Sequence, residues 1–369
     1  MKKIKIAVIG VGIIGDSHIK EYKNIADCEV AAICDINEAR LAEIGDRYDV
    51  KRRFTHIGEM LREGDIDAVD ICLHNNLHAP VTNAVLNAGK NAYCEKPMAG
   101  SYADALSMYE TARKTGNRLH IQLAMVYNDA AHAAKRLIDA GELGEIYHMR
   151  SCGFRRRGRP FIDGYATKEF VNSHTARGGA LFDMGVYRIS QLLYLAGLPK
   201  LERVVGKTYR KMDVDPKRQA ESGFDVEELG TGYAVYANNL SLDVVESWAI
   251  HAENVGRSLI AGDKGGLMFD PLTYHTLKED MQVDMNVDLG AFKYRNHTVH
   301  AENAMFDSPQ TNWINALLGR CELLPTDKIA LETSLLQEGI FLSDKLGREV
   351  TANEIRALSK STAIDVPNL

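Results

Sequence analysis

Apolar and polar positions follow two alternating periods along the first 127 residues. Short β-branched runs predict strands, and the segments between them carry apolar residues at helical spacing. The predicted strands are 3–10, 29–35, 68–73, 91–96 and 118–127, and the predicted helices are 14–25, 37–48, 78–89 and 102–116. Strands that alternate with helices run parallel and are joined by right-handed crossovers. Residues 1–127 are therefore predicted to form a doubly wound α/β domain.

The pattern changes after a predicted helix near 128–141. Longer strands separated by turn residues predict a second α/β domain with a large, mostly antiparallel sheet over residues 128–369. These strands are 144–154, 203–212, 230–239, 240–251 and 256–269, followed by predicted helices at 310–319 and 330–346. The charged stretch 212–228 is predicted to be a loop.

Composition narrows the class of protein. With 45% hydrophobic and 25% charged residues among 369, the chain is typical of a folded globular protein. No apolar run is long enough to span a bilayer, and none of the six cysteines forms a C-x-x-C pair, so we expect a cytoplasmic protein that binds no membrane. The net charge of −6 argues against a nucleic-acid partner.

A glycine-rich motif follows the first predicted strand and opens the first predicted helix. It reads Gly10-Val11-Gly12-Ile13-Ile14-Gly15. In this context the glycines make a tight turn and let the backbone approach a pyrophosphate at a helix N-terminus, which is the Rossmann dinucleotide site. Asp35 ends the next strand, where a carboxylate accepts hydrogen bonds from ribose hydroxyls and repels a 2′-phosphate. The predicted cofactor is NAD.

The candidate chemical group is Lys96 in Glu95-Lys96-Pro97, at the end of a predicted strand. Ligands of doubly wound sheets bind beyond the carboxyl ends of the strands, so Lys96 is expected near the nicotinamide. There it can relay a proton from a substrate hydroxyl as hydride leaves the same carbon. Glu95 is expected to hold the lysine in place, and Pro97 to fix the chain direction. The alternative is a surface lysine in a turn.

Three segments together resemble the glucose-fructose oxidoreductase / inositol dehydrogenase (Gfo/Idh/MocA) family. They are the glycine motif, LHNNLHAPVTNAVLNAGKNAYCEKPMA and GGALFDMGVYRISQLLYLAG, and the resemblance spans nearly the whole chain. It implies a Rossmann domain followed by an α/β domain with an open sheet. It also implies NAD(P)-dependent oxidation or reduction of sugars and polyols, and homo-oligomers (dimers, tetramers or larger) assembled through that sheet.

By the resemblance, Lys96 matches the family's catalytic lysine and Asp183 matches an aspartate that contacts substrate. The family's D-x-G-x-H motif departs here, because Tyr187 replaces the histidine and Ser190 stands where an aspartate often follows. Asp183 and Tyr187 are spaced to share one helix face. Lys96 is ranked first and Tyr187 second as the proton-transfer group. His174, just upstream, is either a replacement from a mobile loop or a polar loop residue.

Further residues are expected beside the cofactor or the substrate. Asn75 and His78 fit a structural or cofactor-contacting role, and Arg40 is placed with the cofactor residues. His74 replaces a residue of the family's T-P-N-x-L-H pattern, and it faces either the nicotinamide end or the core.

A run of arginines precedes the Asp183 segment. One of Arg155, Arg156 and Arg157 is expected to face substrate, with Arg156 the first choice, and the others to pair with acidic residues. Trp248 is expected to pack in the core or an interface. No metal site is predicted, and the set His297, His300 and Glu302 is rejected because its spacing matches no usual site.

The predicted reaction is hydride transfer between NAD and a ring hydroxyl or ketone of a sugar, glycoside or cyclitol, including C3 of glycosides. Lys96 handles the hydroxyl proton. One alternative is an enzyme with captive NAD that exchanges redox equivalents between sugars or cleaves glycosides by oxidation and elimination. A second alternative is a non-catalytic NAD-binding regulator, which would not need Lys96 or Asp183.

Overall fold

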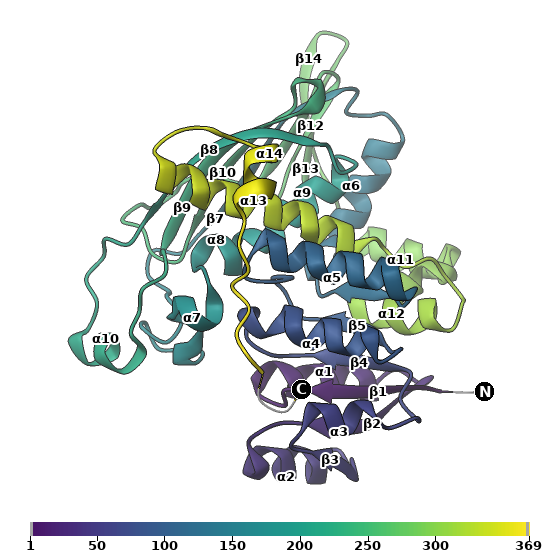
Figure 1. Cartoon of the computed structure of the whole chain (residues 1–369). Coiled ribbons are helices and arrows are strands. Elements are labelled where there is room, and N and C mark those ends of the chain that lie inside the picture. Colours follow the sequence, from purple (N-terminus) through teal and green to yellow (C-terminus); the bar gives the residue numbers. More distant parts are fainter. Residues whose placement is uncertain (1–2, 367–368) are drawn as a thin grey trace. The chain divides into compact units, whose positions relative to one another are not determined.

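The computed structural model describes residues 3–366 and 369 and forms two compact units (Figure 1). The first unit comprises residues 1–122, 308–331 and 361–369, and the second comprises residues 123–307 and 332–360. The expected boundary between residues 127 and 128 therefore falls five residues late. In addition, two C-terminal segments that we expected in the second domain belong to the first unit.

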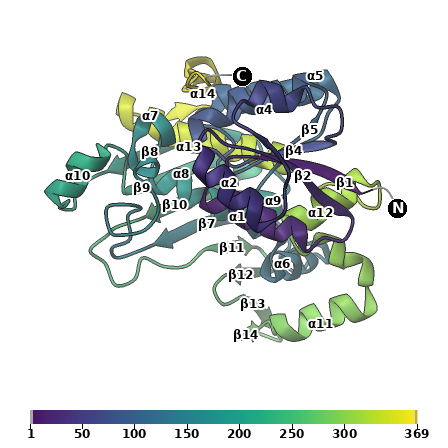
Figure 2. The same cartoon turned by 90° about the horizontal axis from the view of Figure 1, so that it is seen from below.

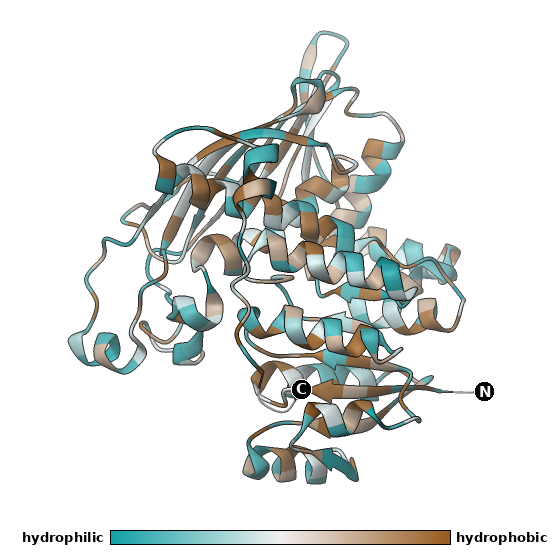
Figure 3. Ribbon diagram, in the orientation of Figure 1, coloured by the Kyte–Doolittle hydropathy of each residue, from teal (hydrophilic) through white to brown (hydrophobic). Residues whose placement is uncertain are grey.

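The first unit is built on a six-stranded parallel sheet. Its strand order is β3-β2-β1-β4-β5-β6, as expected for a doubly wound fold. The strands are β1 (Ile4–Ile9), β2 (Cys28–Cys34), β3 (Arg52–Phe54), β4 (Ala68–Ile71), β5 (Asn91–Cys94) and β6 (Leu119–Ile121). Strand β1 is nearly all buried and is coloured as hydrophobic in Figure 3, which is typical of a strand covered on both faces.

The helices of the first unit cover both faces of this sheet. They are α1 (Ile13–Lys23), α2 (Glu38–Arg47), α3 (Ile57–Leu61), α4 (Asn75–Asn87), α5 (Tyr102–Thr115) and α12 (Pro309–Leu317). From β1 the chain winds outward in both directions. Right-handed crossovers therefore place α1 and α2 on one face and α4 and α5 on the other (Figures 1 and 2).

Helix α12 explains why residues 308–331 belong to the first unit. Trp313 is fully buried in the same apolar cluster as Ile6 and Tyr93, and the Trp313 and Tyr93 ring centroids are 5.9 Å apart. His120 stacks on the same indole, at 5.8 Å between centroids. The burial of one large aromatic ring thus fixes this distant segment to the parallel sheet.

The second unit is built on a nine-stranded sheet of order β14-β13-β12-β11-β7-β10-β9-β8-β15. Only β7 and β10 pair in parallel, and the other neighbours are antiparallel, which confirms the predicted fold class. The strands are β7 (Ile146–Phe154), β8 (Leu201–Tyr209), β9 (Leu229–Tyr236), β10 (Ser241–Ser247), β11 (Leu259–Gly262), β12 (Gly265–Met268), β13 (Thr273–Lys278), β14 (Met281–Asn286) and β15 (Val350–Thr351).

The second unit also contains helices. They are α6 (Asp129–Asp139), α7 (Ser173–Ala176), α8 (Ala180–Asp183), α9 (Gly185–Leu195), α10 (Pro216–Ser222), α11 (Leu289–Val299), α13 (Thr326–Leu346) and α14 (Ala352–Leu358). Four short 3₁₀ turns occupy Ala124–Tyr127, Lys168–Val171, Ala237–Asn239 and Ala301–Phe306. Ile340 of α13 packs against the sheet where Gly206 and Gly232 leave room for it. The face opposite Ile340 exposes large apolar side chains, among them Val205 and Tyr233.

Several short elements differ from the sequence prediction. The predicted loop 212–228 contains α10, and the predicted strand 118–127 ends at Ile121 and continues as a 3₁₀ turn. The hairpin β13–β14 and helix α11 were not predicted. None of the described helices is long and apolar enough to cross a membrane.

Candidate cofactor and substrate sites

The glycine turn between β1 and α1 is shaped for close approach of a ligand. A Cβ atom at Gly10 would lie 2.4 Å from the Cys72 carbonyl oxygen, and one at Gly15 would lie 1.9 Å from the Gly10 carbonyl oxygen. A Cβ atom at Gly12, in contrast, would have no heavy atom within 4 Å. The space beside Gly12 is where the Rossmann turn admits a pyrophosphate, so this turn fits NAD.

This difference between the glycines predicts two distinct defects. Gly12→Ala should keep the fold, because the methyl group enters open space, and should weaken NAD binding by about tenfold or more, because it occupies the pyrophosphate side. Gly10→Ala should lower the melting temperature instead, because Gly10 has φ 84° and no room for a Cβ atom. Calorimetric titration with NAD and thermal unfolding of both variants check this. Wild-type NAD affinity in Gly12→Ala would contradict the assignment.

The adenosine end of the predicted site is formed by the turn after β2. Asp35 accepts hydrogen bonds from the backbone N–H groups of Val11 and Asn37, both at 2.8 Å, so its carboxylate is tied to the glycine turn. Its oxygens keep lone pairs for ribose hydroxyls. Ile36, which was not predicted, is 87% exposed beside Asp35, and Ile13 at the start of α1 is 71% exposed. Both offer an apolar surface of the kind on which a base can pack.

Arg40 is predicted to lie beside the cofactor, and its side-chain contacts restrict what it can contribute there. Its guanidinium donates to the Val11 carbonyl at 2.9 Å and forms ion pairs with Asp16 at 2.9 Å and Glu43 at 2.7 Å. Two carboxylates already neutralise its charge. Arg40 therefore supports the glycine turn and offers little uncompensated charge to a 2′-phosphate, in agreement with NAD as the cofactor.

Lys96 lies in the turn that follows β5, at the same carboxyl edge of the parallel sheet as the glycine turn and Asp35. It is half-buried, and the Lys96–Pro97 peptide bond is cis. Buried Glu95 accepts the backbone N–H of Lys96 at 2.9 Å through Oε2. Glu95 was predicted to hold Lys96 in place, and the contact that does so is with the backbone of Lys96.

His78 joins the Lys96 turn to the loop after β4. It is fully buried on α4, with Nδ1 2.8 Å from the Pro97 carbonyl oxygen and Nε2 3.0 Å from that of Leu73. Burial lowers its pKa. Each ring nitrogen already lies within hydrogen-bond distance of a backbone carbonyl oxygen. Of the two predicted roles of His78, structural and cofactor-contacting, these contacts favour the structural one. Asn75 and His74 are half-buried at the start of α4.

In the second unit, Asp183 ends the short helix α8. Its Oδ2 accepts a hydrogen bond from Trp248 Nε1 at 3.0 Å, and Trp248 is fully buried in an apolar cluster. The predicted core role of Trp248 thus includes holding the candidate substrate residue. The start of α8 is capped by Glu227, which accepts the N–H groups of Gly179 at 2.7 Å and Leu181 at 2.9 Å. Burial raises the pKa of Glu227 to about 7.

Tyr187 and Asp183 do not share one continuous helix. Met184 separates α8 from α9, so Tyr187 lies in the first turn of α9, where it is half-buried. The prediction that Asp183 and Tyr187 share one helix face is therefore wrong, because the two residues lie on consecutive helices. Ser190 is buried, and its hydroxyl donates to the Tyr187 carbonyl at 3.0 Å. His174 is exposed on α7.

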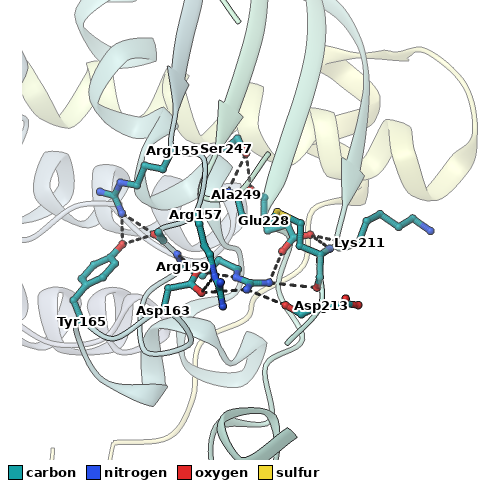
Figure 4. A network of polar contacts seen from close by, with 12 residues as sticks. Arg155, Arg157, Arg159, Asp163, Tyr165, Lys211, Asp213, Glu228, Ser247 and Ala249 are labelled. Atoms are coloured by element: carbon teal, nitrogen blue, oxygen red, sulfur yellow. Dashed lines mark hydrogen bonds and ion pairs between the residues drawn. The ribbon is translucent and has the colours of Figure 1, made fainter. Parts of the chain in front are cut away.

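The arginine run forms a loop after β7 that is anchored by one buried member (Figure 4). Arg159 is 1% exposed and contacts Asp163 at 2.9 Å and Glu228 at 3.1 Å. Arg157 pairs with Asp163 at 3.1 Å, and Arg155 donates to Tyr165. Arg156 is exposed, and no hydrogen bond or ion pair links its side chain to the part of the chain that the structure describes. Of the three candidates, Arg156 has the guanidinium available for a ligand.

A group of His18, Asp70 and Cys72 could offer three metal-ligand atoms within 4.8 Å of one another. Hydrogen bonds account for this group: His18 Nδ1 lies 2.9 Å from Asp70 Oδ2 and 3.3 Å from Cys72 Sγ. The rejected set of His297, His300 and Glu302 forms ordinary ion pairs, His297 with Asp307 and His300 with Glu302.

Two family models match the chain. A model described as an oxidoreductase family with an NAD-binding Rossmann fold matches residues 4–123. A model of the GFO/IDH/MocA C-terminal domain matches residues 131–268. The two matches lie on the parallel-sheet unit and on the nine-stranded-sheet unit, respectively.

Among curated relatives, D-glucoside 3-dehydrogenase of Escherichia coli (strain K12) is 27% identical over 282 residues, which cover 74% of this chain and 79% of that protein. Inositol 2-dehydrogenase of Salmonella typhimurium (strain LT2) is 32% identical over 146 residues, 38% of this chain and 43% of that protein. Both relatives are named as dehydrogenases of a sugar derivative or a cyclitol.

Solved structures show the same fold. Levoglucosan dehydrogenase in complex with NADH aligns with a TM-score of 0.76 at 20% identity, covering 95% of this chain and 99% of that one. The WlbA dehydrogenase of Bordetella pertussis, in complex with NADH and UDP-GlcNAcA, aligns with a TM-score of 0.78 at 22% identity, covering 95% and 98%. At this identity the likeness establishes the architecture of both units.

Proposed function

Because this chain belongs to the Gfo/Idh/MocA oxidoreductase family, we propose that it is an NAD-dependent dehydrogenase acting on a ring hydroxyl of a sugar, glycoside or cyclitol. The observation that carries the proposal is the placement of Lys96 at the same sheet edge as the glycine turn and Asp35. That edge is where doubly wound sheets bind a dinucleotide. A glycoside oxidised at C3 is the preferred substrate, since a relative that aligns with 74% of the chain is a D-glucoside 3-dehydrogenase.

The proposed reaction removes a hydride from a ring carbon and a proton from the hydroxyl on that carbon, which leaves a ketone. Bound NAD supplies the hydride acceptor. Lys96 takes the hydroxyl proton through its amine, and Glu95 holds the lysine backbone through the N–H bond described above. Tyr187 is the second candidate for the proton, and His174 the third.

Residues of the second unit are proposed to bind the substrate. Asp183 is held by Trp248 and by the capped helix α8, so its carboxylate has a defined position for sugar hydroxyls. Arg156 lies on a loop anchored by buried Arg159, and its guanidinium suits vicinal hydroxyls or a carboxylate. The polar character of these groups agrees with a carbohydrate ligand.

We extend the proposal to a homo-oligomer assembled through the nine-stranded sheet. The face opposite α13 exposes Val205, Tyr209 and Tyr233, and Val205 pairs directly with Tyr233 across β8 and β9. An exposed apolar face of this kind is a common protein interface. A cytoplasmic location stays a prediction from the sequence.

The function is tested by the absorbance of reduced nicotinamide when purified protein meets methyl glucosides, hexoses and inositols, with and without added NAD. NADH accumulating far beyond the protein concentration is the expected result and identifies the substrate. A change that stops at one equivalent without added NAD would replace the proposal by the captive-cofactor alternative. No reduction with any of these compounds, despite NAD binding, would favour the non-catalytic regulator.

A further inference from the structure

His18 of α1 lies between two buried carboxylates from neighbouring strands of the parallel sheet. Its Nδ1 is 2.9 Å from Asp70 Oδ2, and its Nε2 is 3.0 Å from Glu95 Oε1. Asp70 belongs to β4, and Glu95 follows β5 directly. His18, Asp70 and Glu95 are 4%, 0% and 9% exposed, so water contributes little to the solvation of this triad.

Between two ionised carboxylates, His18 satisfies both contacts only when it donates a proton from each ring nitrogen. Ionised carboxylates only accept hydrogen bonds, and a neutral imidazole has only one N–H group. The ring is therefore an imidazolium. Burial alone would lower the pKa of His18, but Cys72 and Asp70 beside the ring raise that pKa well above its usual value. Burial also raises the pKa of the Cys72 thiol, and the ring of Tyr93 lies edge-on to His18.

Glu95 connects this imidazolium to the lysine turn. One of its oxygens, Oε1, accepts from His18, and the other, Oε2, accepts the Lys96 backbone N–H at 2.9 Å. Burial alone would raise the pKa of Glu95, but the hydrogen bond from His18 holds it below its usual value. Hydrogen bonds at both oxygens restrict the rotation of the Glu95 carboxylate, and through it they restrain the position of the Lys96 backbone.

We propose that His18 is a positioning residue for Lys96, acting through the carboxylate of Glu95. As an imidazolium it also supplies the positive charge that lets Asp70 and Glu95 remain ionised inside the sheet. His78 holds the other end of the same turn through the Pro97 carbonyl oxygen. The assignment of a catalytic consequence rests on the proposed function of Lys96.

Two neutral substitutions separate the two hydrogen bonds of His18. The amide nitrogen of asparagine replaces Nδ1, so His18→Asn keeps the donor to Asp70 and loses the donor to Glu95. The longer glutamine places its amide nitrogen near Nε2, so His18→Gln keeps the donor to Glu95. Both variants remove the same positive charge, and each is therefore the control for the other.

We expect His18→Asn to lower kcat by about 10-fold to 100-fold, with NAD affinity and substrate KM changed by no more than about threefold, because the lysine is displaced while the cofactor turn stays intact. His18→Gln should retain most of the wild-type kcat. Thermal unfolding of both variants shows whether they fold. Equal kcat values in two folded variants, or wild-type kcat in His18→Asn, would overturn the proposal.

A measurement without substrate tests the charge itself. In protein labelled with ¹⁵N at histidine, both ring nitrogens of His18 should show the protonated chemical shift from about pH 6 to about pH 9, beyond the range where an ordinary histidine has lost its proton. The His18→Gln spectrum assigns the signal. A neutral ring at pH 7 would overturn the proposal even if the enzyme is active. A protonated ring in an inactive protein would instead refute the proposed function.

Discussion

Replacing Lys96 by methionine is expected to lower turnover by about 10²-fold to 10⁴-fold, the usual contribution of a positioned acid or base. Methionine keeps the length and apolar contacts of the side chain and removes the group that takes the hydroxyl proton. NAD affinity should stay within about threefold of wild type. The glycine turn and Asp35 are separate segments of the sheet edge and keep their contacts. Steady-state kinetics with the substrate from the absorbance screen, and calorimetric titration with NAD, measure the two quantities.

The matched control is Lys114→Met, because Lys114 is exposed near the end of α5. It should leave both turnover and NAD affinity unchanged. Turnover retained in Lys96→Met would refute the lysine as the proton-transfer group and move Tyr187 to first place. Equal losses of turnover in Lys96→Met and Lys114→Met would show that the total charge of the protein, and not the position of Lys96, determines the rate.

Arg159→Met is expected to destabilise the second unit by about 3–5 kcal/mol, the usual cost of removing one partner from a buried ion pair. Methionine fills much of the same volume but leaves Asp163 and Glu228 buried without their shared cation. The guanidinium also donates to the carbonyl oxygen of Asp213 at 3.0 Å, so the loop 155–165 loses its anchor. Urea unfolding followed by tryptophan fluorescence reports the change, because Trp248 lies in this unit.

Arg156→Met provides the comparison on the same loop. Arg156 is exposed, so its loss should leave the free energy of unfolding within about 0.5 kcal/mol of wild type. It should raise the substrate KM, since Arg156 is the arginine proposed to bind the sugar. Equal stability of the two variants would mean that the Arg159 network contributes no net stabilisation.

The fold was predictable where hydrophobic periodicity is strong. Four of the five strands predicted in the first unit, and the long strands β7, β8, β9 and β10 of the second, appear close to their predicted positions. The division between units was not predictable, because helix α12 has an ordinary amphipathic sequence. Only the packing of Trp313 against Tyr93 and His120 shows that it belongs to the parallel sheet. Such a contact joins residues about 200 positions apart and leaves no local pattern.

The candidate site was predictable where chemistry and spacing occur together in one short segment. The glycine motif, Asp35 and the Glu95–Pro97 turn are of this kind. The supporting residues were not predictable. His18 meets Glu95, and Asp183 meets Trp248, only after the chain folds. A usable signal was present for Asp70, since a carboxylate inside a buried strand requires a partner.

By the proposed function, this chain moves a hydride from a ring carbon of a carbohydrate to NAD. The most direct measurement uses methyl glucoside deuterated at C3, mixed with the protein and NAD, followed by mass spectrometry of the nicotinamide. We predict one deuterium in each reduced nicotinamide, together with a slower reaction than with the protiated glucoside. This readout also works for a cofactor that stays bound. Reduced nicotinamide without deuterium would exclude C3 as the hydride donor. If glucosides deuterated at each ring position in turn all failed to transfer deuterium to the nicotinamide, the proposed reaction would be contradicted.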